Sequence, residues 1–186
     1  MPVRVVLAAV LALSGALIAP AQADEVSRQT RSAFLNQQAA AYPLANTFTL
    51  HSLPGSKHTI FLDFDGNTVL EGSWSEQNTG ITAKAYPGFN KAGSATTFTD
   101  TELDFVQQVW RRVAEIYSPF DVDVTTQDPG TAAISRTSAD DDVYGVQVAI
   151  TSDSAAPAAA CGAKYASCSG IASIGSFDQV ETTQSQ

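Results

Sequence analysis

Histidine is scarce in this chain of 186 residues, which contains only His51 and His58. Zinc hydrolases of the H-E-x-x-H class need two histidines one helical turn apart with a glutamate between them. Neither histidine lies in that pattern, and neither can replace it, because a zinc site also needs a third ligand and supporting hydrogen bonds. We therefore assign no catalytic residue and no metal ligand in this sequence, and we expect no zinc to bind to it.

Positive charge is also sparse. The chain has 10 Lys and Arg residues against 19 Asp and Glu residues, so its formal net charge is −9 at pH 7. The basic residues are scattered, and Arg111-Arg112 is the one adjacent pair. Nucleic acids and anionic membranes favour clustered Lys and Arg. We therefore expect no nucleic-acid partner and no membrane partner.

Cysteine is limited to Cys161 and Cys168, in a stretch rich in Gly, Ala and Ser. A metal site would need two further ligands nearby, and none is evident. In an exported protein, such a pair normally forms a disulfide that closes a short loop. We predict a Cys161–Cys168 disulfide, which contributes about 2–3 kcal/mol in the chain-entropy model.

A long apolar run is found only at the N-terminus. Arg4 precedes the apolar residues 5–18, and Ala21-Gln22-Ala23 forms a small-x-small cleavage pattern. The run is shorter than the roughly 20 residues of a membrane helix. The pattern predicts a Sec-type signal peptide over residues 1–23, cleavage after Ala23, and a secreted protein. An uncleaved N-terminal anchor is the alternative.

The rest of the chain divides into three predicted regions. Residues 24–55 have few large apolar side chains and are interpreted as a loosely ordered leader or propeptide-like segment; residues 56–178 form the domain, and residues 179–186 are a polar tail. Alternation and β-branched or aromatic residues predict strands over 58–64, 120–126, 145–151 and 170–177. The connection 66–98 is expected to hold a hairpin or to pack its aromatic side chains over the sheet.

One long helix is predicted after Thr99. Thr99 and Glu102 match a capping box, and Ser118-Pro119 ends the helix. Its apolar stripe consists of Leu103, Val106, Trp110, Val113 and Tyr117. Gln107 falls away from the stripe, on the polar side. The order of elements predicts an α/β fold with a mixed sheet of about four strands backed by this helix.

Two pairs of aspartates attract attention. Asp63 and Asp65 lie at the end of the first strand, as in the D-x-D-G-T motif of haloacid dehalogenase-like phosphohydrolases, although Asn67 replaces the threonine. The structural alternative is a pair of carboxylates that accept hydrogen bonds from a turn. Asp121 and Asp123 share one face of the strand 120–126 and are interpreted as solvent-facing.

A larger resemblance is spread along residues 56–178. The segments that carry it are His58–Thr68, Gly72-Ser73-Trp74, Phe98–Glu102, Val109–Glu115, Tyr117–Thr126 and Gly170–Phe177. In content and order they resemble the N-terminal half of secreted bacterial metzincin-like zinc metallopeptidases. The resemblance implies an incomplete metzincin-like catalytic domain, in which the H-E-x-x-H motif would follow the last strands. It therefore implies a truncated chain that is inactive by itself.

The resemblance also implies a mechanism and a substrate. In such peptidases zinc activates a water molecule, the glutamate of the motif acts as general base, and an extended peptide or protein substrate lies along an edge strand. Here the edge strand would comprise Gly170, Ile171, Ala172, Ser173, Ile174 and Gly175. A secreted peptide-binding module without enzymatic activity is the second interpretation, and the phosphohydrolase is the third.

Overall fold

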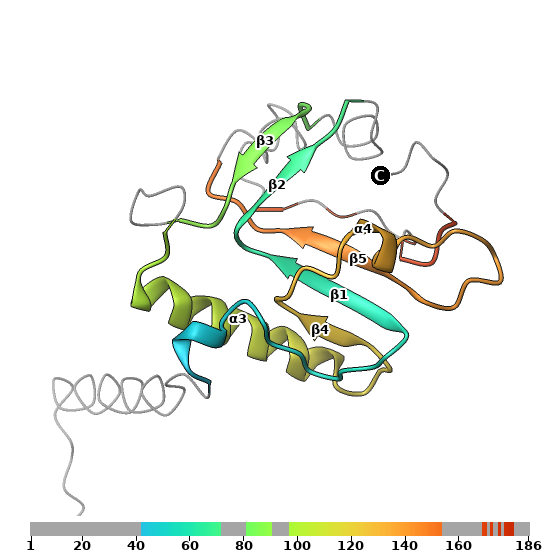
Figure 1. Ribbon diagram of the computed structural model, residues 1–186, viewed down its shortest axis with the longest axis horizontal. Helices are drawn as coiled ribbons and strands as arrows, with labels where there is room; N and C mark the ends of the chain where they lie inside the picture. The colour runs from blue at the N-terminus through green and yellow to red at the C-terminus, as the bar shows by residue number, and fades with distance from the viewer. Residues whose placement is uncertain are drawn as a thin grey trace, which may run out of the picture. The chain divides into compact units, whose positions relative to one another are not determined.

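A parallel sheet of three strands lies at the centre of the fold, with β1 (His58–Asp63) between β4 (Asp123–Thr125) and β5 (Tyr144–Ala149) (Figure 1). The computed structural model describes residues 42–71, 81–90, 97–153, 169, 170, 172, 175 and 177–180. Ile60 of β1 is in register with Val124 on one side and with Val146 on the other. The predicted α/β class is confirmed, and so are the strands expected at 58–64, 120–126 and 145–151, within a few residues at their ends.

A short antiparallel hairpin follows β1 and confirms one of the two expectations for residues 66–98. Strand β2 (Gly66–Val69) pairs with β3 (Lys84–Pro87), so the described strands form two sheets instead of one mixed sheet. Phe89 N–H donates to the Phe64 carbonyl at 2.7 Å, which returns the chain to the end of β1. A Cβ at Gly88 would lie 2.4 Å from that same carbonyl oxygen, so this close approach requires glycine.

Helix α3 (Asp100–Tyr117) covers one face of the sheet (Figure 1). Its start is set locally, because Thr99 and Glu102 form the complete capping box that the sequence predicts. Val106 and Trp110 are buried in the core, and Trp110 Nε1–H donates to the Val124 carbonyl at 2.8 Å. The helix therefore packs where its apolar stripe indicates. Among the described residues, no helix has the length and apolar character needed to cross a membrane.

The two faces of β1 have different neighbours. Ile60, Leu62 and Phe64 alternate into the core beneath α3, as a strand period of two requires. Phe61 and Asp63 point to the opposite face, toward α4 (Thr131–Ile134) and β5. This second face carries the candidate site.

Two predictions for α3 are wrong at single residues. Tyr117 is 37 % exposed, because the stripe reaches the last turn of the helix, beyond the sheet that covers its centre. Gln107, expected on the polar side, is fully buried, and its Nε2 donates to Thr47 Oγ1 at 2.9 Å. Residues 43–47, which precede β1, cover Gln107. The helix is therefore buried by the sheet on one side and by this segment on another.

Residues 42–55 are a packed part of the domain. They contain the 3₁₀ helix η1 (Leu44–Asn46), Thr47 is fully buried, and Leu50 belongs to the core cluster. Hydrogen bonds join residues within 47–53 to α3 and to β4 and the residues after it, so the expectation of loose order over 24–55 is wrong for this part. Residues 24–41 and the predicted signal peptide, residues 1–23, lie outside the described part of the chain.

The predicted fourth strand is not formed at the described residues of 170–177. Gly170 and Ala172 have no regular structure, and Gly175 is in a turn with a φ of 74°. A strand residue needs a φ near −120°, so Gly175 cannot continue a strand. Phe177 instead packs its ring 5.6 Å from Tyr144, at the amino-terminal end of β5.

Candidate functional site

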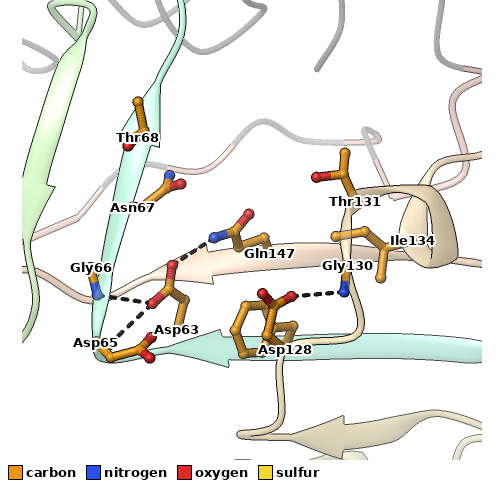
Figure 2. Close-up of a pocket in the computed structure, with 11 residues that line it drawn as sticks. Asp63, Asp65, Gly66, Asn67, Thr68, Asp128, Gly130, Thr131, Ile134 and Gln147 are labelled. Atoms are coloured by element: carbon orange, nitrogen blue, oxygen red, sulfur yellow. Dashed lines mark hydrogen bonds between the residues drawn. The ribbon is translucent and has the colours of Figure 1, made fainter.

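A polar pocket of about 310 Å³ opens at the carboxyl end of β1, on the face of the sheet that carries α4 (Figure 2). It is bounded by the start of β2, the loop after β4, helix α4 and β5. Its lining consists of Phe61, Asp63, Asp65, Gly66, Asn67, Thr68, Asp128, Gly130, Thr131, Ile134 and Gln147. In open α/β sheets, ligands bind outside the carboxyl ends of parallel strands, where the strand order changes direction. This pocket lies at that position, because β1 is flanked by β4 on one side and β5 on the other.

Asp63 is the most constrained side chain of the pocket. It is 3 % exposed, and its Oδ1 accepts hydrogen bonds from Asp65 N–H and Gly66 N–H, each at 3.2 Å. Its Oδ2 accepts from Gln147 Nε2 at 2.6 Å (Figure 2). Burial raises the pKa of Asp63 to about 6, with a further contribution from the neighbouring carboxyl of Asp65.

These contacts favour the structural interpretation of the aspartate pair. A nucleophilic carboxylate must be ionised and must have an oxygen free to attack. Both Asp63 oxygens already accept hydrogen bonds from the protein, so neither is free to attack. Asp63 accepts hydrogen bonds from the turn between β1 and β2 and from Gln147 of β5. This agrees with the structural alternative, in which the carboxylates accept hydrogen bonds from a turn.

The other side of the pocket is shaped by a second aspartate turn. Asp128 Oδ1 accepts a hydrogen bond from Gly130 N–H at 2.7 Å, and Gly130 has a φ of 76°. Ile134 of α4 then packs over β5, where a Cβ at Gly145 would lie 2.3 Å from the Thr59 carbonyl oxygen. The absence of a side chain at Gly145 thus allows the strands and α4 to meet closely.

The two histidines do not line this pocket, and they have different hydrogen-bond partners. His51 Nδ1 lies 2.6 Å from Asp123 Oδ2, and His51 Nε2 lies 2.9 Å from Gln127 Oε1. His58 Nδ1 is 3.2 Å from the Asp121 carbonyl oxygen. Within the described residues, no three His, Cys, Asp or Glu side chains come close enough together to hold a metal ion. Since both nitrogens of His51 are already hydrogen-bonded, these residues do not fit a zinc site.

The interpretation of Asp123 as solvent-facing is wrong. Asp123 was expected to face solvent, but it is 6 % exposed and its Oδ1 accepts from Ser52 N–H and Leu53 N–H at 2.9 and 3.0 Å. The predicted alternation of exposed and buried residues along 120–126 is wrong, because residues 123–126 are all buried and residues 50–53 cover the edge of the strand. The sequence shows Asp123 in a strand and His51 far from it in the chain, but nothing in the sequence indicates that the two side chains are partners.

The predicted substrate and disulfide residues have different outcomes. Gly170, Ala172 and Gly175 are described but are not in a strand. Ile171, Ser173, Ile174, Cys161 and Cys168 lie outside the described residues. Gln147 was missed: a polar residue between Val146 and Val148, it is the signal that one face of β5 meets a polar group.

Comparison of the chain with protein-family models, with curated proteins and with solved structures finds no match. The resemblance to zinc metallopeptidases therefore rests on the sequence segments quoted above alone.

Proposed function

We propose that this chain forms the N-terminal part of the catalytic domain of a secreted, metzincin-type zinc endopeptidase. The observation that supports it is the coincidence of the resembling segments with folded elements in one continuous order. His58–Thr68 spans β1 and most of β2, Phe98–Glu102 contains the helix cap, Val109–Glu115 lies in the second half of α3 and includes the buried Trp110, and Tyr117–Thr126 leads into β4. Of the other two segments, Gly72-Ser73-Trp74 lies outside the described residues, and Gly170–Phe177 is not in a strand at its described residues.

This chain by itself supplies none of the zinc chemistry. When bound, zinc in such enzymes activates the water that attacks the scissile carbonyl. The described histidines are committed to Asp123, Gln127 and the Asp121 carbonyl, so they take no step in that reaction. What the chain contributes is the parallel sheet, the helix that covers one face of it, and a second face on which α4 lies.

The test is to sequence the gene and its transcript beyond codon 186 in all three frames. We expect an H-E-x-x-H motif with a third ligand after a Gly turn. The extended protein should bind one zinc per chain by elemental analysis and cleave an unstructured peptide, and Gln in place of the motif glutamate should stop cleavage while zinc stays bound. A downstream sequence without such a motif would refute the peptidase proposal.

A peptide-binding module without catalysis is the second candidate, and one observation favours it. Among the described residues, β5 pairs with β1 alone, so its other edge has no strand partner. The strand Tyr144–Ala149 carries no charge and no proline, and Val148 is 40 % exposed. Unprotected edges of this kind accept an added strand. The N–H groups of Tyr144 and Ile150 point to β1, so by alternation the N–H of Ala149 points to the open edge. Binding of a fluorescent extended peptide, unchanged by zinc or chelator and abolished by Ala149→Pro, would support this function; loss of cleavage and binding together on chelation would refute it.

A further inference from the structure

Residues 47–53, which we call the strap, run along the outer edge of β4. Ser52 N–H donates to the Val124 carbonyl at 3.1 Å, and Thr126 N–H donates to the Leu50 carbonyl at 3.0 Å. Val124 N–H in turn donates to Ser52 Oγ at 2.8 Å. These bonds satisfy backbone groups that an edge strand otherwise leaves open to another chain. The strap is therefore what ends the sheet on this side.

The two ends of the strap are held by different forces. At its start, Thr47 is fully buried and accepts from Gln107 at 2.9 Å, and Leu50 packs into the core at 3 % exposure. At its end, Leu53 is 44 % exposed and contributes no core packing. Burial of apolar surface does not change with pH, whereas charged hydrogen bonds do. The end of the strap thus depends on its polar contacts.

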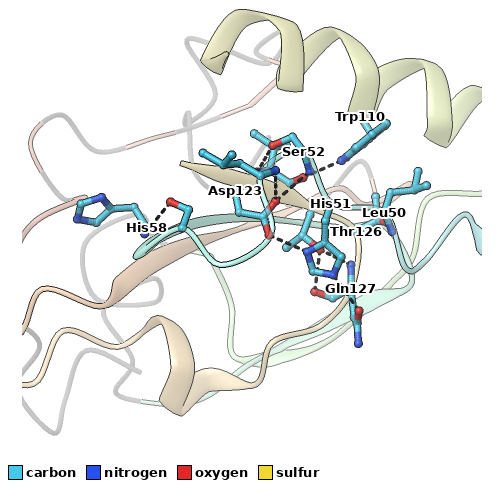
Figure 3. A network of polar contacts seen from close by, with 12 residues as sticks. Leu50, His51, Ser52, His58, Trp110, Asp123, Thr126 and Gln127 are labelled. Atoms are coloured by element: carbon cyan, nitrogen blue, oxygen red, sulfur yellow. Dashed lines mark hydrogen bonds and ion pairs between the residues drawn. The ribbon is translucent and has the colours of Figure 1, made fainter. Parts of the chain in front are cut away.

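Those contacts converge on Asp123 and His51 (Figure 3). Asp123 Oδ1 accepts the backbone N–H groups of Ser52 and Leu53, and its Oδ2 lies 2.6 Å from His51 Nδ1. The other ring nitrogen, Nε2, faces Gln127 Oε1 at 2.9 Å. Both neighbours present oxygen atoms, so an imidazolium donates to both, whereas a neutral ring has one N–H and satisfies only one.

We propose that His51 is a pH-operated clasp: its imidazolium fastens the end of the strap to Asp123 and Gln127, and deprotonation loosens that end from β4. Among the described residues around the ring, Asp123 is the one charged group that faces it. Gln127 and Thr125, whose backbone forms a β-bridge with that of His51, are neutral. Burial of the ring lowers the pKa of His51, but the hydrogen bonds to Asp123 and Gln127 and the charge of Asp123 outweigh it, so the pKa is raised above 6.5.

The sign of the effect follows from this direction. A histidine whose pKa is higher in the folded protein than in the unfolded chain stabilises the fold fully below pH 6.5. That contribution is lost as the pH rises through the pKa of the folded state. The exposure of the strap end, and its access to proteases, then increases from mildly acid to mildly alkaline solution.

Hydrogen exchange on the purified chain tests the clasp. Protection of the peptide covering residues 47–55 is measured at pH 5.5 and 8.5, corrected for the intrinsic exchange rates, and compared with α3. We expect protection of the strap to fall about fivefold at the higher pH, the equivalent of one net hydrogen bond. His51→Gln, which keeps a polar side chain without titration, should remove this dependence. His58→Gln is the matched control and should retain it.

A second measurement needs no variant. Nitrogen NMR of the imidazole rings reports whether His51 carries a proton on both nitrogens at pH 5.5, and whether it loses one at the midpoint of the loss of strap protection. Coincident midpoints support the clasp. A ring with a single N–H at pH 5.5, equal protection of the strap at both pH values, or a pH dependence that survives His51→Gln would each overturn it.

Discussion

The buried carboxyl of Asp63 makes this fold less stable at neutral pH than at mildly acid pH. Its pKa is raised from 3.8 to about 6, first by burial and then by the hydrogen bond and charge of Asp65. Between these two values the unfolded chain has released the proton and the folded protein still holds it. Folding therefore takes up a proton there, and stability falls as the pH rises.

The magnitude follows from the two pKa values. The interval between 3.8 and about 6 corresponds to about 3 kcal/mol of free energy, lost between low pH and pH 7. This is a large share of the 5–15 kcal/mol or so that stabilises a typical domain. Because Asp63 and Asp65 are neighbours, the proton is shared by the pair. Substitution of either aspartate should therefore change how steeply the free energy of unfolding falls with pH.

Asp63→Asn tests this reasoning. The amide oxygen can still accept from Asp65 N–H and Gly66 N–H, and Gln147 can turn its own amide to present an oxygen to the new NH₂ group. The asparagine side chain does not titrate, so burial costs the variant no free energy of ionisation as the pH rises. At pH 4 it should resemble the wild type, and at pH 7.5 it should be more stable by about 3 kcal/mol.

The assay is urea unfolding from pH 4 to 7.5, followed by tryptophan fluorescence, to which the buried Trp110 contributes. Asp65→Asn should remove part of the slope, and Asp140→Asn, at an exposed position, is the matched control. Comparing each variant with the wild type at the same pH removes the separate contribution of His51. If Asp63→Asn keeps the wild-type slope, or is less stable than the wild type at pH 7.5, the reasoning is refuted.

Two further substitutions test the local structure. Gly88→Ala places a Cβ 2.4 Å from the Phe64 carbonyl oxygen and should lower the free energy of unfolding by about 1–3 kcal/mol, whereas Gly55→Ala, with open space around its Cβ but a φ of 90°, should cost less in the same urea titration. Thr99→Ala removes the cap that Glu102 N–H uses and should cost about 1 kcal/mol by circular dichroism, while Thr99→Ser should restore most of it; equal losses in the two variants would contradict the capping argument.

Helix α3 and strand β1 were determined by residues close to one another in the sequence. The capping box joins residues three apart, and the apolar stripe follows the helical repeat, so the start and the buried centre of α3 were predicted correctly. A run of apolar and β-branched residues ending in Asp-Phe-Asp-Gly likewise predicted β1 and the turn that Asp63 closes. Local patterns suffice where hydrogen bonds are local.

The expectations of a strand at Gly175 and of loose order at residues 47–53 were wrong because a local sequence pattern does not report a contact partner. Alternation in 170–177 predicts a strand, but Gly175 adopts a positive φ that a turn uses. Polar residues in 42–55 suggested loose order, although Thr47 and Leu50 are buried by β4 and α3. The same composition can be exposed or covered, and only the neighbouring chain decides which.

By itself the sequence determined the α/β class, the one long helix, the three central strands and the absence of an H-E-x-x-H motif. The tertiary structure alone decided the partners of the polar side chains. His51 meets Asp123 across 72 residues of chain, and Gln147 meets Asp63 across 84. Periodicity shows which side of an element a residue lies on, but the parallel order β4-β1-β5 decides what faces it.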